Sequence, residues 1–119
     1  MLLLMTLMGC QSQKSLDLEE KPNIIERVLR SDVTLVDVRS VEDFEKSSVK
    51  GAINIPLKDL PTQLDLLRDK PNIVLFCNKG RQSSQALEIL KKNKINTAVS
   101  GKTYHNVNAI ISQEAKVKK

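Results

Sequence analysis

The chain of 119 residues is poor in aromatic side chains, with no Trp, one Tyr and two Phe. Without large rings, the hydrophobic core must rest on Ile, Leu and Val. The net charge of +5 would permit nucleic-acid binding, but the sequence offers neither an aromatic platform nor a recognisable reading helix. We therefore expect no nucleic-acid partner, and the positive charge modestly favours small anionic substrates instead.

Motifs of the common cofactor sites are also absent from the sequence. There is no Walker-type loop, no dinucleotide fingerprint and no spacing typical of metal ligands. We expect no cofactor and no metal. The chain also lacks low-complexity tracts and internal repeats, and its length suits one domain around one hydrophobic core.

The longest apolar run is residues 1–8, which is too short to span a bilayer as a helix. It is long enough for the apolar region of a secretory signal, and Leu7-Met8-Gly9-Cys10 resembles a bacterial lipoprotein cleavage box. We expect a signal peptide over 1–9, lipidation at Cys10 and a polar tether over 10–20. No Lys or Arg precedes the run, which a start site upstream of Met1 would explain. A buried or disordered apolar terminus is the alternative.

This interpretation predicts an exported protein on the periplasmic face of a bacterial membrane, or a soluble periplasmic one. Gln11 after the cysteine resembles an outer-membrane sorting signal if the source is Gram-negative. Lipidation of Cys10 would leave Cys77 as a free thiol in an oxidising compartment, which calls for an explanation. A Cys10–Cys77 disulfide is the competing account, and it would tie a flexible tether to a sheet edge.

Apolar runs and helical periodicities alternate along the rest of the chain, which indicates an α/β fold with a parallel sheet covered on both faces. Ligands bind such sheets at the carboxyl ends of the strands. Strands are predicted at 33–38, 51–56, 73–76 and 97–99. Helices are predicted at 24–29, 41–46, 57–67 with an interruption near Pro61, 83–93 and 106–115.

Cys77 ends the apolar run 73–76 and begins a loop that leads into the helix predicted from Ser83. Unpaired amides and the helix dipole favour an anion at this place, and Lys79 and Arg81 add positive charge. These features favour a thiolate, so Cys77 is the candidate nucleophile. Gly80 allows the loop to turn its amides inward. The competing interpretation is a small buried cysteine of purely structural role.

Several motifs in this order resemble a single-domain rhodanese, or thiosulfate sulfurtransferase, over roughly residues 21 to 112. They are Asp37-Val-Arg39, Phe44, Gly51-Ala-Ile-Asn-Ile-Pro56 and Cys77-Asn-Lys-Gly-Arg-Gln-Ser83. The resemblance implies a rhodanese domain over 21–119, a three-layer α/β fold with about five parallel strands, and a persulfide on Cys77. Ser48 stands where the family often has a histidine.

The implied reaction is sulfur transfer from thiosulfate or a similar donor to a thiol or cyanide. The expected substrate-binding residues are those of the loop: Asn78, Lys79, Gly80, Arg81, Gln82 and Ser83. Ser83 is expected to cap the following helix. Asp37 and Arg39 are expected to be structural, with Arg39 pairing with Glu42 or Asp43. His105 is expected to be solvated.

Two alternatives remain. A phosphatase or arsenate reductase also uses a loop cysteine at a helix N-terminus, but those loops generally carry arginine six positions later, where this chain has Ser83. A non-catalytic sulfur carrier or binding lipoprotein of the same fold is the other.

Overall fold

The computed structural model describes residues 23–117, so the segments 1–9 and 10–20 and Cys10 lie outside the described part. It contains a parallel sheet of four strands in the order β2-β1-β3-β4. The strands are β1 (Thr34–Asp37), β2 (Ile53–Asn54), β3 (Ile73–Cys77) and β4 (Ala98–Thr103). The predicted α/β class is confirmed. The described residues form the four strands indicated by the apolar runs, whereas the resemblance implied about five.

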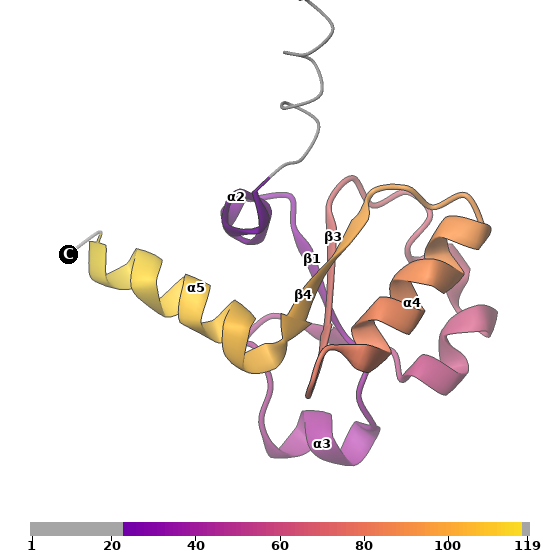
Figure 1. The fold of residues 1–119 in the computed structure, drawn as a ribbon, viewed down its shortest axis with the longest axis horizontal. Coiled ribbons are helices and arrows are strands. Elements are labelled where there is room, and N and C mark those ends of the chain that lie inside the picture. Colours follow the sequence, from indigo (N-terminus) through magenta and orange to yellow (C-terminus); the bar gives the residue numbers. More distant parts are fainter. Residues whose placement is uncertain (1–22, 118–119) are drawn as a thin grey trace, which may run out of the picture.

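Helices cover both faces of this sheet, as Figure 1 shows. On one face α4 (Arg81–Lys92) packs on β3 and β4, together with the 3-10 helix η2 (Leu57–Thr62). On the other face lie α2 (Ile24–Leu29) and α5 (Tyr104–Val117), which pack against each other. The short helix α3 (Val41–Lys46) follows β1 at the carboxyl end of the sheet.

The central strand β3 is buried along its whole length and contributes side chains to two hydrophobic clusters. Because side chains alternate along a strand, Ile73, Leu75 and Cys77 join the cluster under α4. Val74 and Phe76 join the cluster beneath α2 and α5. The sequence pattern therefore directs the sulfur of Cys77 toward the α4 side of the sheet.

Some element boundaries differ from those predicted. The segment 57–67 forms η2 and a second 3-10 helix, η3 (Leu64–Leu66), rather than one helix, and Pro61 inside η2 has no N–H to donate to a regular helix. The helix α4 begins at Arg81 instead of Ser83. The helix α5 begins at Tyr104, before the predicted residue 106, and β4 extends to Thr103.

The end of β4 passes very close to its neighbours. A Cβ built on Gly101 would lie 2.9 Å from side-chain atoms of Val74 and Val107, so glycine is required there. A register irregularity follows between Leu75 and Phe76, and Phe76 pairs with Lys102 instead of Gly101. This irregularity places Lys102 beside the loop that follows β3.

Among residues 23–117 no helix is both long and apolar enough to cross a membrane.

Candidate active site

Cys77 is the last residue of β3, and its side chain is only 1% exposed. It nevertheless lines a cavity of about 590 Å³ together with Asn78, Lys79, Arg81 and Gln82. Cys77 is a free thiol. Only a small reactant, or the protruding end of a larger one, can therefore reach the sulfur through this cavity.

Two backbone amides point at the sulfur. The Gly80 amide donates to Cys77 Sγ at 3.1 Å and the Ser83 amide at 3.3 Å. Gly80 has a φ of 95°, the left-handed region, and is the residue that caps α4. The chain can curl this tightly because glycine has no Cβ. The loop therefore supplies two preoriented hydrogen-bond donors where negative charge on sulfur would sit.

The thiol itself has an acceptor on the opposite side. Cys77 Sγ donates to the Lys102 carbonyl oxygen at 3.5 Å. Loss of the thiol proton would remove this contact and leave the two amides as the groups that stabilise the sulfur. The described geometry therefore accommodates the thiol, and it provides the donors that a thiolate needs.

The prediction that Ser83 caps α4 is wrong. Ser83 is the third residue of the helix, and the capping residue Gly80 offers no side chain. The Ser83 hydroxyl is instead within hydrogen-bond distance of the Gly80 carbonyl oxygen at 3.0 Å, the Lys102 carbonyl oxygen at 3.3 Å and Ser100 Oγ at 2.9 Å. Ser83 therefore links the first turn of α4 to the end of β4.

The prediction that Arg39 pairs with Glu42 or Asp43 is wrong. Arg39 pairs with Asp37, whose Oδ2 lies 2.7 Å from Arg39 Nη2, and both side chains are buried. The two side chains meet because the backbone turns after β1: the Arg39 amide also donates to Asp37 Oδ1 at 3.0 Å. The hydrogen bond with Asp37 raises the pKa of the Arg39 guanidinium above its usual range, although burial opposes this.

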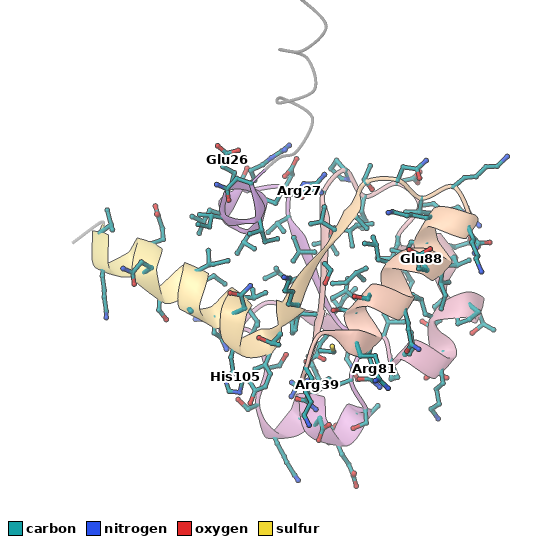
Figure 2. The ribbon with its side chains drawn as sticks, in the orientation of Figure 1. Glu26, Arg27, Arg39, Arg81, Glu88 and His105 are labelled. Atoms are coloured by element: carbon teal, nitrogen blue, oxygen red, sulfur yellow. The ribbon has the colours of Figure 1, made fainter. Side chains whose placement is uncertain are left out.

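The Asp37–Arg39 pair reaches the cysteine loop through Asn78. Arg39 Nη1 donates to Asn78 Oδ1 at 3.2 Å, and the Asn78 amide nitrogen lies 3.4 Å from Asp43 Oδ2 of α3. Figure 2 shows Arg39 and Arg81 at the same end of the sheet, with Arg27 at the opposite end. Arg39, paired with Asp37, thus contacts the first residue of the loop.

Sequence reasoning missed other members of this arrangement. Tyr104 places its ring 4.1 Å from the guanidinium carbon of Arg39, and Ser48 donates to Asp37 Oδ2 at 2.6 Å. Near Cys77, Ser100 Oγ contacts Ser83 Oγ, and the Lys102 carbonyl oxygen accepts from Cys77 Sγ. Tyr104 directly follows β4, Ser100 and Lys102 lie within it, and Ser48 follows α3, so no shared local pattern marks these residues. His105 is exposed beside the Tyr104 ring and does not reach the cavity. The described residues contain no cluster that could hold a metal ion.

The chain is similar to known proteins in sequence and in fold. The family model described as Rhodanese-like domain matches residues 20–110. A thiosulfate sulfurtransferase, PspE of Escherichia coli, is 46% identical over 59 residues, which are 48% of this chain and 57% of PspE. The putative sulfur carrier protein YrkF of Bacillus subtilis is 32% identical over 60 residues, 50% of this chain and 32% of YrkF. The chain thus spans about half, or less, of these relatives.

Among solved structures, an E. coli rhodanese with anions superposes with a TM-score of 0.57 at 34% identity, covering 62% of this chain and 89% of that one.

Proposed function

Because the chain belongs to the rhodanese-like domain family, we propose that it is a sulfurtransferase that carries sulfur as a persulfide on Cys77. The donor is thiosulfate or a similar sulfane-sulfur compound, and the acceptor is a thiol or cyanide. The observation that carries the proposal is the convergence of the Gly80 and Ser83 amides on Cys77 Sγ at the floor of a cavity with cationic walls.

In the first step the Cys77 thiolate attacks the outer sulfur of thiosulfate. A bond forms between Cys77 Sγ and that sulfur, the sulfur–sulfur bond of thiosulfate breaks, and its electron pair leaves on sulfite. Lys79 and Arg81, both exposed on the cavity wall, bind the donor oxygens and neutralise their charge. Asn78 and Gln82 add polar contacts on the same wall. The reaction leaves a Cys77 persulfide.

In the second step the acceptor sulfur or the cyanide carbon bonds to the outer sulfur of the persulfide. The sulfur–sulfur bond breaks, and its electron pair stays on Cys77 Sγ as the thiolate. The same two amides stabilise negative charge on sulfur before and after this step, so neither state of the enzyme must reorganise the loop. The name of the PspE relative supports this choice of donor.

The first alternative is a sulfur carrier that forms the persulfide and passes it to a protein partner, and the name of the YrkF relative favours it.

A phosphatase or arsenate reductase is the second alternative. The sixth position after Cys77 holds Ser83, which is buried and bonded to β4, so no arginine is available there to grip a tetrahedral anion. The loop favours a single sulfur atom over a phosphate.

The test is covalent loading followed by turnover. Mass spectrometry after incubation with thiosulfate should show a gain of one sulfur atom, and Cys77→Ser should show none. With thiosulfate and cyanide the wild-type protein should release thiocyanate over many cycles. Loading without turnover would indicate a carrier. Release of phosphate from an aryl phosphate without any sulfur loading would overturn the proposal.

A glycine pair offers a matched test of the amide cradle. Gly80 and Gly51 both have left-handed φ, 95° and 87°, and an added Cβ meets nothing closer than 3.9 Å at Gly80 and nothing within 4 Å at Gly51. Each Ala variant should therefore lose about 1–2 kcal/mol of stability through backbone strain alone. Only Gly80→Ala should also slow persulfide formation, because only its amide faces Cys77 Sγ. Equal activities in the two variants would contradict the role of the cradle.

The export signal over 1–9, the tether over 10–20, the lipid anchor at Cys10 and the periplasmic location remain proposals from the sequence. Mass analysis of the protein recovered from bacterial membranes tests them. A processed chain should begin at an acylated Cys10, and Cys10→Ala should remain unprocessed. An unmodified chain that retains Met1 would contradict the anchor.

A further inference from the structure

Lys102 has a backbone conformation that is unusual for lysine. Its φ is 71°, a left-handed value that costs energy for any residue with a Cβ. It lies at the carboxyl end of β4, next to the register irregularity opposite Leu75 and Phe76. Strain of this kind persists when surrounding contacts impose it, and it often accompanies a functional site.

Those contacts come from the residues around the nucleophile. The Lys102 amide donates to Ser100 Oγ at 3.1 Å, and the Lys102 carbonyl oxygen lies within hydrogen-bond distance of Ser83 Oγ and of Cys77 Sγ. Ser83 Oγ and Ser100 Oγ are themselves 2.9 Å apart. The backbone of Lys102 is thus held by a closed set of hydrogen bonds, which fixes the position of its Cβ relative to the loop.

The Lys102 side chain begins next to Gly80 of the loop. A Cβ built on Gly80 would lie 3.9 Å from Lys102 Cβ, which is the nearest atom to it. The lysine is exposed and does not line the cavity whose walls carry Lys79 and Arg81. Within residues 23–117, no carboxylate forms a salt bridge with it. Lys102 therefore presents a positive charge just outside the cavity.

We propose that Lys102 is a specificity-determining residue that binds the anionic body of a thiol acceptor whose sulfur has entered the cavity. This inference rests on the sulfur transfer proposed above. Thiosulfate is small enough to lie between the cavity walls, so Lys79 and Arg81 suffice for it. An acceptor thiol whose carboxylate extends past the rim on the Gly80 side of the loop meets Lys102 there.

In the step concerned, the acceptor thiol sulfur bonds to the outer sulfur of the Cys77 persulfide. The persulfide sulfur–sulfur bond breaks with its electron pair on Cys77 Sγ, and the acceptor proton goes to solvent or stays with the newly formed persulfide. Lys102 takes no part in this exchange of bonds. It raises the local concentration of acceptors with negative charge and orients them.

The test compares two acceptors of similar size, 3-mercaptopropionate and 2-mercaptoethanol, which differ in the charge of the distal group. The persulfide is loaded from thiosulfate, and its loss to each thiol is followed by mass spectrometry to give a rate ratio for each variant. The ratio is the rate with 3-mercaptopropionate divided by the rate with 2-mercaptoethanol. Lys102→Met should lower this ratio by about two- to fivefold, the size expected of an exposed ion pair. Lys102→Arg should retain the ratio.

Lys91→Met is the matched control, because Lys91 is also an exposed lysine, in the last turn of α4, and does not line the cavity. It removes the same net charge and should leave the ratio unchanged. An unchanged ratio in Lys102→Met, an equal loss in Lys91→Met, or an equal slowing of both thiols by Lys102→Met would each overturn the inference. A wild-type protein that accepts no sulfur from thiosulfate would instead overturn the proposed function itself.

Discussion

The two ends of the sheet are held by similar networks, each built from an arginine and an asparagine. At the amino end, Arg27 of α2 donates to Asn72 Oδ1 at 3.1 Å and to the Thr97 carbonyl oxygen at 2.9 Å. Asn72 is fully buried and donates back to the Arg27 carbonyl oxygen and to Asp32. At the carboxyl end, Arg39 joins Asp37 to Asn78.

The networks differ in what they hold. Asn72 lies just before β3 and ties α2 to the strand. Asn78 lies just after β3 and is the first residue of the loop that carries the amide donors to Cys77. Arg39 is buried with a carboxylate partner, whereas Arg27 Nε is the only buried side-chain polar atom in residues 23–117 without a partner. The same type of contact therefore serves stability at one end and loop position at the other.

The largest effect is expected from breaking the carboxyl-end network. Asp37→Ala leaves the buried Arg39 guanidinium without its counter-charge, which should cost about 3–5 kcal/mol of unfolding free energy. Loading of Cys77 from thiosulfate should also slow, because Arg39 no longer holds Asn78 in place. Urea denaturation and the loading rate under native conditions measure the two effects.

A double variant, Asp37→Ala with Arg39→Met, separates charge from position. It removes both buried charges, so part of the lost stability should return, while loading should remain slow because no group holds Asn78. If the double variant loads sulfur at the wild-type rate, the network has no role in positioning the loop.

A smaller effect, on stability alone, is expected at the amino end. Asn72→Ala removes a fully buried amide and leaves several groups without partners, which should cost about 1–3 kcal/mol. The folded fraction should load sulfur at the wild-type rate. The comparison between the two ends fails if Asn72→Ala slows loading as much as Asp37→Ala at equal folded fraction.

The sequence was sufficient for the order of the four strands and for the position of Cys77. Alternation at residues 73–77 determines which face each side chain of β3 takes, and a cysteine at the end of a parallel strand must lie at the carboxyl edge. The left-handed glycine at position 80 was also predictable, since a short loop that returns its amides to the sulfur needs such a residue.

Other features depend on contacts between distant segments, which local patterns do not encode. Arg39 was expected to pair with Glu42 or Asp43, yet the backbone after β1 turns it onto Asp37. Ser83 was expected to cap α4, yet its hydroxyl reaches Ser100, 17 residues away. The left-handed backbone at Lys102, whose amide donates to Ser100 Oγ, had no signal in the sequence.

The smallest effect concerns two lysines with left-handed backbone, one at each end of the sheet. Lys94, after α4, has a φ of 64°, and Lys102 has a φ of 71°. Glycine at either position relieves backbone strain but increases the conformational entropy of the unfolded chain. Each variant should therefore gain about 0.5–1 kcal/mol in unfolding free energy, measured by thermal or urea denaturation.

Because the Lys102 carbonyl and amide keep their partners in Lys102→Gly, persulfide formation should continue. That variant alone should lose the preference for the carboxylate-bearing thiol, whereas Lys94→Gly should keep it. If Lys102→Gly destabilises the protein, the hydrogen bonds around Ser83 and Ser100 do not fix this backbone in the way described.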